Sequence, residues 1–295
     1  MRVFVTGGSG FIGSAAVPEL LGAGHQVLAL ARSDKSAEAL KAAGAEVHRG
    51  SLDDPEDLAV AAAGTDGVLH LAFNHEDFSD MTRAVQTDLR AIEAIGAALE
   101  GSDRPFVVTS GTLMLAAVDG VATEQDTPAP RIHRGACDVA ALALAERGVR
   151  SSVVRLAPTV HGRGDRGFVP QLIGIARRTG VAAYVGEGTN RWPAVHRLDA
   201  AHLYRLALES APAGTALHGS ADEGVPFKDI AAAIAQGLGV PLKSIPPTEA
   251  EAHFGWLGMV ATIDNATSSE RTRELLGWRP EQAGLLADLE EGHYF

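Results

Sequence analysis

The sequence predicts an α/β fold, with a doubly wound parallel sheet and a smaller α/β unit built mainly from later residues. The first observation is a buried apolar strand at residues 3–5, which leads through a glycine-rich turn into a helical pattern from Ser14 to Leu21. The second is an alternation of strand-like and helical stretches, which is typical of parallel sheets with right-handed crossovers. The third is a length of 295 residues, enough for a sizeable core in one large or two interlocked domains.

Composition narrows the class of protein. Hydrophobic residues make up 46% of the chain and charged residues 21%, which is ordinary for a soluble globular protein. A formal net charge of −12 argues against nucleic acid or an anionic membrane as the main partner. The single cysteine, Cys137, excludes an internal disulfide and a cysteine-based metal cluster. Because the first strand begins at residue 2 and no apolar run could span a bilayer, we expect a cytoplasmic protein without a signal peptide.

The glycine-rich turn carries the clearest functional information. Gly7, Gly10 and Gly13 follow one another at three-residue spacing between the first strand and the first helix. In that context glycines let the backbone turn tightly, approach a pyrophosphate and pack the helix against the sheet. The helix N-terminus adds unpaired N–H groups and the positive end of its dipole. We therefore expect a dinucleotide to bind against this turn, at Gly7, Gly10, Phe11, Ile12 and Gly13.

The end of the second predicted strand, residues 25–31, bears on which dinucleotide binds. A carboxylate at this position bonds the ribose 2′-hydroxyl of NAD, whereas an arginine suits the 2′-phosphate of NADP. Here the strand is followed by Arg32 and Ser33, and the first carboxylate is Asp34. We expect NADP rather than NAD, held in part by Arg32 and Ser33. The alternative is that Arg32 is a solvated surface residue.

The remaining elements follow in order. Pro55, directly after Asp54, suits a first helical turn and opens a predicted helix that ends at Ala63. The other predicted helices of this half cover residues 35–43 and about 80–99. The other predicted strands cover residues 45–50, 67–72, 105–110 and 151–156. A ligand of such a sheet lies across the carboxyl ends of its strands.

The stretch from Thr6 to Gly13 resembles the TGxxGxxG fingerprint of the short-chain dehydrogenase/reductase superfamily, and is most similar to its extended NAD(P)-dependent epimerase/dehydratase branch. The resemblance covers nearly the whole chain and implies a Rossmann fold with a substrate-binding cap. It implies a small-molecule substrate and, because members often pair through helices of the nucleotide domain, a homodimer. It further implies that the cofactor contacts residues of three later segments. These residues are Leu52 and Asp53, Leu71 and Ala72, and Pro158 and Val160.

The chain departs from this family where the family's chemistry resides. The resemblance implies a Ser or Thr after the fifth strand, and Thr112 occupies that position. It also implies a Tyr-x-x-x-Lys helix, in which the tyrosine exchanges a proton with the substrate carbonyl. The corresponding segment, residues 130–148, contains neither tyrosine nor lysine, and Arg134 and Asp138 stand in their places. Candidates for the catalytic groups are therefore Thr112, His133 and Arg134, with Tyr184 as a further possible acid.

Three interpretations remain open at this point. A non-standard acid serves an NADP(H)-dependent oxidoreductase that acts on a small organic carbonyl, or the substrate is itself activated and needs little acid. Alternatively, the chain binds NADP without turnover, as a regulator. A further alternative is an epimerase or dehydratase with a tightly held cofactor. We expect residues 1–165 and 195–222 to form the dinucleotide-binding domain, and residues 166–194 and 223–295 to form the cap.

Overall fold

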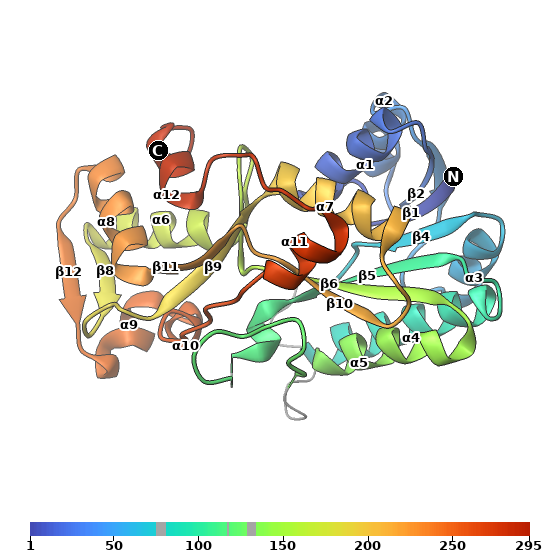
Figure 1. The fold of residues 1–295 in the computed structure, drawn as a ribbon. Coiled ribbons are helices and arrows are strands. Elements are labelled where there is room, and N and C mark those ends of the chain that lie inside the picture. Colours follow the sequence, from blue (N-terminus) through green and yellow to red (C-terminus); the bar gives the residue numbers. More distant parts are fainter. Residues whose placement is uncertain (75–80, 117, 129–133) are drawn as a thin grey trace.

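A seven-stranded sheet forms the centre of the nucleotide-binding unit. In this computed structural model, which describes all residues except 75–80, 117 and 129–133, the strand order is β10-β6-β5-β4-β1-β2-β3 and every pairing is parallel (Figure 1). The strands are β1 (Arg2–Thr6), β2 (Gln26–Ala31), β3 (Glu46–Arg49), β4 (Gly67–His70), β5 (Pro105–Gly111), β6 (Arg150–Leu156) and β10 (Thr215–Gly219). The order reverses at β1, so the carboxyl ends of β1 and β4 flank the topological switch point where ligands bind in such folds.

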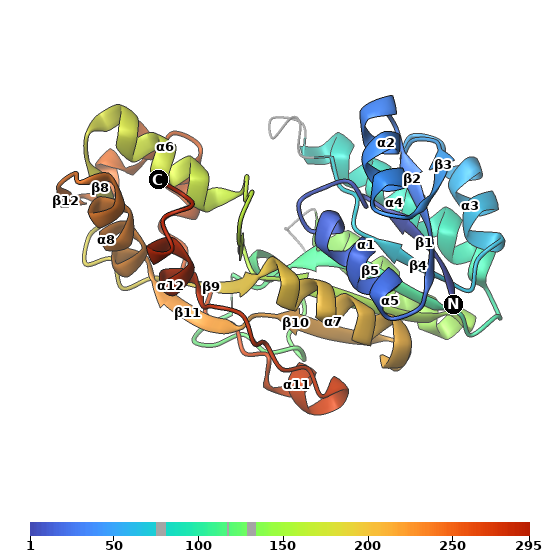
Figure 2. The ribbon, with the colours of Figure 1, turned by 90° about the horizontal axis from the view of Figure 1, so that it is seen from above.

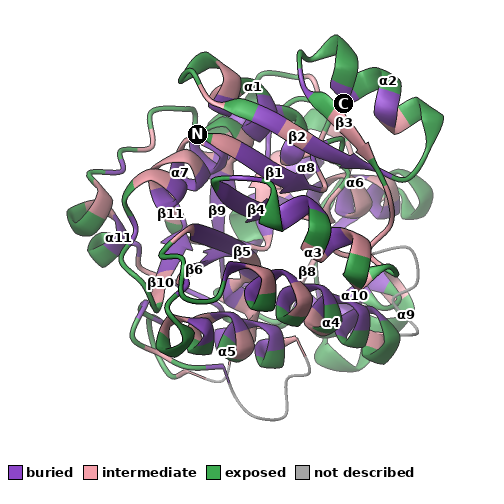
Figure 3. Ribbon diagram, turned by 90° about the vertical axis from the view of Figure 1, so that its right-hand side faces the viewer, coloured by how far each residue is buried: buried purple, intermediate pink, exposed green. Residues whose placement is uncertain are grey.

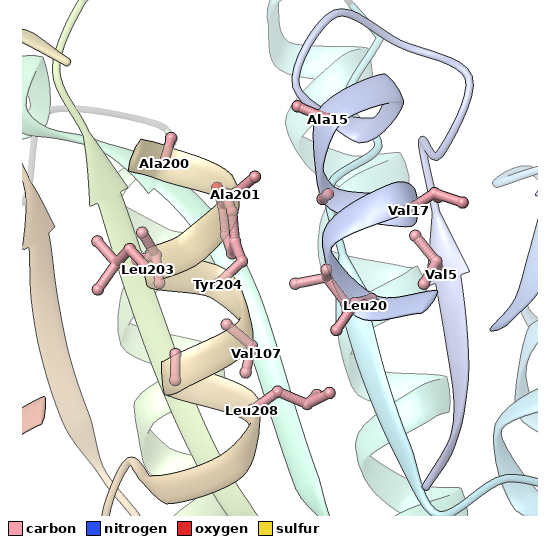
Figure 4. Close-up of a cluster of buried hydrophobic side chains, with 14 of the residues drawn as sticks. Val5, Ala15, Val17, Leu20, Val107, Ala200, Ala201, Leu203, Tyr204 and Leu208 are labelled. Carbon is pink, nitrogen blue, oxygen red and sulfur yellow. The ribbon is translucent and has the colours of Figure 1, made fainter. Parts of the chain in front are cut away.

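Helices cover both faces of this sheet. They are α1 (Gly13–Gly22), α2 (Asp34–Ala42), α3 (Pro55–Ala63), α4 (Met81–Leu99), α5 (Gly135–Ala143) and α7 (Arg197–Ser210). Val3 and Val5 pack in one core cluster with α1, α2 and α7, while Phe4 packs in another with α3, α4 and α5. This alternation follows from the two-residue period of a strand. Figure 4 shows the side chains of α1 and α7 meeting above β1 and β5, and Figure 3 shows the buried strands between helices with exposed outer faces.

Local sequence explains where the first helices begin. Ser33 accepts a hydrogen bond from the backbone N–H of Ser36, and the Ser36 side chain bonds back to Ser33, so a capping box starts α2. At α3, the Asp54 side chain accepts from the N–H of Asp57, with Pro55 in the first turn. Each cap satisfies N–H groups that have no partner inside the helix.

The cap is a second α/β unit with its own core (Figure 2). It contains a three-stranded sheet of order β11-β9-β7 and a pair of parallel strands, β12 and β8. Its strands are β7 (Thr159–His161), β8 (Ala182–Val185), β9 (Arg191–His196), β11 (Asp222–Pro226) and β12 (Leu242–Ile245). Its helices are α6 (Phe168–Thr179), α8 (Phe227–Leu238), α9 (Ala250–Phe254), α10 (Leu257–Val260) and α12 (Leu285–Glu290). Trp192 lies at the centre of this core, its ring 4.9 Å from that of Phe227.

The chain crosses between the two units more than once. After α10 it passes through α11 (Glu270–Leu276), which contacts β10 and α7. Trp278 then lies fully buried in the core cluster of α1 and α7, with its indole N–H donating to the carbonyl of Asp199. The domain boundaries given above stay a prediction. Among the described residues, none of the helices is both long and apolar enough to cross a membrane.

Candidate cofactor and active site

Steric contacts require glycine at two positions of the turn between β1 and α1. Gly7 has a φ of +70°, and a Cβ there would lie 2.6 Å from the backbone nitrogen of Ala72. A Cβ on Gly13 would lie 2.2 Å from the carbonyl oxygen of Gly7. The turn therefore packs against the end of β4 on one side and against its own helix on the other. A larger residue at either position would push these backbones apart.

The outer side of the same turn presents unpaired donors. Gly10 is exposed, and Phe11 and Ile12 are half-buried. Among the described residues, the backbone N–H groups of Phe11 and Ile12 have no acceptor, and no side chain caps the N-terminus of α1. Two free N–H groups at the positive end of a helix form a cradle for phosphate oxygens. The residues present thus fit the pyrophosphate of a dinucleotide.

Three residues follow β2 at the adjoining edge of the site. Arg32 is exposed, and Ser33 is exposed and occupied as the cap of α2. The carboxylate of Asp34 forms a surface ion pair with Arg49, with 3.0 Å between Oδ1 and Nη2. The first carboxylate after β2 is therefore engaged with β3.

Two of the cofactor contacts that the resemblance implies, Leu52 and Asp53, lie after β3. Leu52 is half-buried and packs against the core cluster of α3 and α4, while Asp53 is exposed. The hydroxyl of Ser51 donates to the Asp53 carboxylate at 3.1 Å. These residues border the same edge of the sheet as Arg32, because β2 and β3 are parallel neighbours.

A buried polar chain connects β1, β4 and α4. The Thr6 hydroxyl lies 2.8 Å from Nδ1 of His70, and Nε2 of His70 lies 2.9 Å from a carboxylate oxygen of Asp88. The same hydroxyl accepts from the N–H of Ala72 at 3.2 Å. The pattern assigns Nε2–H of His70 as the donor to Asp88 and leaves Nδ1 to accept from Thr6. The chain fixes Leu71 and Ala72, both half-buried, against the glycine turn.

The sequence alone does not predict this hydrogen-bonded chain, because Thr6, His70 and Asp88 lie far apart in it. A histidine at the end of a buried strand needs a partner for each ring nitrogen, which was the available signal.

Thr112 lies directly after β5 and is fully buried. Its hydroxyl donates to Oδ1 of Asn265 at 2.9 Å, and its carbonyl accepts from Nδ2 of the same residue at 2.9 Å. The side chain therefore joins β5 to the segment that follows α10. To orient a substrate group, Thr112 would have to exchange this bond, and its catalytic role stays a prediction.

Arg134 stands immediately before α5, with its guanidinium 3.9 Å above the ring of Phe73. Its Nε is buried and has no hydrogen-bond partner among the described residues. Burial lowers the pKa of Arg134, an effect that the charge of Asp88 opposes. A cation held on an aromatic ring, with a donor left over, is suited to binding a developing negative charge. His133 lies outside the described residues, and its catalytic role stays a prediction.

The helix itself carries a buried ion pair. Asp138 accepts from Nε of Arg155 at 2.8 Å, with 0% and 1% of the two side chains exposed. Arg155 also donates to the carbonyl of Asp126 at 2.8 Å. Cys137, next to Asp138, is buried, and burial together with Asp88 raises the pKa of its thiol. A thiol of raised pKa is a weak nucleophile, in line with a packing role.

The last two cofactor contacts implied by the resemblance lie where the chain leaves β6. Pro158 and Val160 are both half-buried, and β7 begins at Thr159. Leu156 at the end of β6 is paired with Gly111 at the end of β5. Pro158 and Val160 therefore follow the same sheet edge as Thr112.

Comparison with known proteins relates this geometry to a family. The model of the NAD dependent epimerase/dehydratase family matches residues 3–218. The chain belongs to this family. An uncharacterised protein of Schizosaccharomyces pombe is 48% identical over 296 residues, covering 100% of both chains. The 2-alkyl-3-oxoalkanoate reductase of Stenotrophomonas maltophilia is 30% identical over 256 residues, covering 82% of this chain and 77% of its own. The structure of MoeE5 in complex with UDP-glucose and NAD matches with a TM-score of 0.76 at 25% identity, covering 99% of this chain and 97% of that one.

Membership in the epimerase/dehydratase family confirms the predicted fold class and makes the departures in α5 informative. Where the resemblance implies tyrosine, Arg134 lies on Phe73; where it implies lysine, Asp138 is buried against Arg155. The position of the lysine is thus filled by a carboxylate that already has a partner. The turn between β1 and α1 fits a dinucleotide, while the two positions where the resemblance implies tyrosine and lysine hold charged side chains.

Proposed function

We propose that this protein is an oxidoreductase that transfers hydride between a nicotinamide dinucleotide and the carbonyl group of a small organic substrate, and that it prefers NADP(H) to NAD(H). The observation that carries the proposal is the cradle formed by the free N–H groups of Phe11 and Ile12 at the N-terminus of α1. The names of two similar proteins support it, since one is a reductase of an oxoalkanoate and the other binds NAD.

The chain's residues divide the work between binding and charge stabilisation. The bound cofactor supplies or accepts the hydride. The N–H groups of Phe11 and Ile12 hold its phosphates, and Arg32 and Ser33 receive the 2′-phosphate that distinguishes NADP. As the carbonyl carbon gains hydride, its oxygen gains negative charge, and the Arg134 guanidinium stabilises that charge. Reduction consumes one proton per turnover, and Thr112 and His133 stay candidates for handling it.

A second candidate function is a regulator that binds NADP without turnover. The buried pair of Asp138 and Arg155 favours it, because this pair occupies the place of the lysine that the family uses for catalysis. Breaking a buried pair of this kind costs about 3–5 kcal/mol. The helix is therefore built to be stable without the usual catalytic residues.

One experiment separates the two functions. The purified protein is titrated with NADPH and with NADH, following cofactor fluorescence and the melting temperature, and NADPH consumption is then measured with a panel of aldehydes and ketones. An oxidoreductase consumes NADPH with at least one carbonyl. A regulator binds NADPH tightly and consumes none. If neither cofactor changes the fluorescence or the melting temperature, both functions are refuted.

A pair of glycine variants shows whether the cradle is the binding site. A Cβ on Gly10 would face the exposed side of the turn, with 3.2 Å to the carbonyl oxygen of Gly7 as its closest contact, so Gly10→Ala should fold. The added methyl stands where the pyrophosphate approaches, and we expect at least tenfold weaker binding of NADPH. Gly22→Ala, at the other end of α1, meets nothing within 4 Å and serves as the matched control. Equal affinity of the two variants for NADPH would show that the cofactor does not bind at this turn.

A further inference from the structure

The loop of residues 162–167 joins two elements of the cap, β7 and α6. It comes directly after the segment that contains Pro158 and Val160, and it ends at Gly167, the residue before α6. Arg163 and Arg166 are exposed, and Gly162 has a φ of +125°. If Pro158 and Val160 contact the cofactor, as the resemblance implies, this loop begins beside the cofactor site. Its shape therefore matters to any substrate held there.

One phenol hydroxyl connects the two ends of this loop. Oη of Tyr294 accepts from the N–H of Gly162 at 3.0 Å and donates to the carboxylate of Asp165 at 3.1 Å. The other oxygen of Asp165 accepts from the N–H of Gly167 at 2.6 Å. Removing the hydroxyl would leave the first N–H without its acceptor and the carboxylate without one of its donors.

Tyr294 can act as a fixed point because its neighbours are packed into the cap. The ring of Phe295 lies against Gly237 of α8, so closely that a Cβ on that glycine would be 2.2 Å from it. The His293 side chain is only 6% exposed and faces Asp288 of α12, with Nε2 3.7 Å from the carboxylate. Residues 293–295 thus form an anchor on two cap helices, and Figures 1 and 2 both show the end of the drawn chain beside α12.

Helix α12 also holds the start of the loop, through Asp288. His161, the last residue of β7, is fully buried, and its Nδ1 lies 2.8 Å from the carboxylate of Asp288. Bonds to His161, together with nearby imidazoles, hold the pKa of Asp288 below its ordinary value although burial acts to raise it. On β9, the neighbouring strand in the sheet, Nε2 of His196 would lie only 2.7 Å from a Cβ on Gly162. Asp288 therefore contacts both His161, directly before the loop, and His293 of the anchor.

We propose that Tyr294 is a positioning residue, whose hydroxyl holds the 162–167 loop in the conformation that the substrate site requires. The bonds from Gly162 through Tyr294 and Asp165 to Gly167 act on the loop's backbone, beside a direct bond of 3.0 Å from the N–H of Asp165 to the carbonyl of Gly162. That the loop borders the substrate rests on the proposed function. The fastening of the loop by Tyr294 does not.

The test uses Tyr294→Phe, which keeps the ring in place and removes the hydroxyl. We expect hydrogen exchange at the N–H groups of Gly162 and Gly167 to become about tenfold faster. Trypsin cleavage after Arg163 and Arg166 should become faster by a similar factor, and the melting temperature should change little. Ser244→Ala is the matched control, since it removes a hydroxyl that donates to the carbonyl of Gly186 elsewhere in the cap. It should change neither readout in the loop.

Asp165→Ala provides an independent route to the same link, should Tyr294→Phe fail to fold. Tyr294→Phe also removes the acceptor of the Gly162 N–H, and Asp165→Ala also removes the acceptor of the Gly167 N–H. Both break the bond between Tyr294 and Asp165, so the double variant should loosen the loop by less than the sum of the two single effects. Unchanged exchange and cleavage in a folded Tyr294→Phe protein would overturn the proposal.

Kinetic measurements then distinguish the attachment of the loop to Tyr294 from the loop's role at the substrate site. With a carbonyl substrate, Tyr294→Phe should raise KM several-fold and leave NADPH affinity unchanged. A loosened loop with an unaltered KM would overturn the loop's role at the substrate site. Exchange and cleavage are measured without cofactor, so they report on Tyr294 even if NADPH does not bind and the proposed function fails.

Discussion

The preference for NADP(H) depends on one exposed side chain and can be tested by removing it. Arg32→Ala deletes the guanidinium that follows β2, next to a carboxylate, Asp34, that already forms an ion pair with Arg49. A hydrogen bond to a charged group contributes about 1.5–3 kcal/mol. Because Arg32 is exposed and its charge is screened by solvent, the lower end applies, about 1.5 kcal/mol or roughly tenfold in affinity.

The assay is a fluorescence titration of the wild type and the variant with each cofactor. We expect the Kd for NADPH to rise about tenfold in Arg32→Ala and the Kd for NADH to stay within about twofold, since NADH has no 2′-phosphate. Lys41→Ala, at the far end of α2, removes the same charge and should change neither value. A wild type that binds NADH as tightly as NADPH, or a variant that loses both equally, would refute the preference and leave the dinucleotide cradle standing.

Three further predictions concern catalysis and stability. Arg134→Ala should lower kcat about 100- to 1000-fold with little effect on NADPH binding, whereas Arg134→Lys, which keeps the charge, should recover part of the rate; equal rates in steady-state assays would remove Arg134 from the mechanism. Thr112→Ala leaves Asn265 without its donor and should cost about 1–3 kcal/mol in urea unfolding; if the rate is intact in this less stable protein, Thr112 is structural and not catalytic. Burial lowers the pKa of His218 from 6.5 to about 4, against the opposing effects of Glu124 and the Ser268 carbonyl. The stability that neutral His218 contributes is therefore complete above its unfolded pKa and is lost as pH falls toward its folded value, at about 1.4 kcal/mol per pH unit. His218→Asn keeps a donor for Ser268 and cannot titrate, so its deficit relative to wild type should shrink on acidification; a deficit that is constant between about pH 7 and about pH 4.5 would show that His218 is not the titrating group.

The sheet and its first helices could be predicted because their signals are local. The helix expected from Pro55 to Ala63 is α3 to the residue, since the proline, the cap at Asp54 and the apolar spacing all lie within the segment. The fourth strand was expected over residues 67–72 but ends at His70. The next two residues leave the strand to pack against Gly7, and that contact depends on the fold as a whole.

The polar links of the site could not be predicted, because their partners are far apart in the sequence. Thr112 was chosen by its distance from the fifth strand, and nothing near it in the chain indicates that Asn265 takes its hydroxyl. Sequence spacing placed Asp138 in the lysine position, but its partner Arg155 comes from a strand on the other side of a turn. Such pairs are set by tertiary packing, which periodicity and residue type do not specify.

The pair of Asp138 and Arg155 limits what chemistry α5 can support. To restore the family's Tyr-x-x-x-Lys pair, Asp138→Lys would place a second cation beside a buried arginine and leave neither with a counter-charge. A buried charge without a partner costs several kcal/mol, so the helix would lose stability before it gained a proton donor. Arg134, immediately before this helix, lies on Phe73, and its buried Nε has no hydrogen-bond partner in the part of the chain that the structure describes. Under the proposed function, Arg134 would stabilise negative charge as a fixed cation, and we expect the substrates to be carbonyls whose reduction is limited by that charge rather than by the supply of a proton.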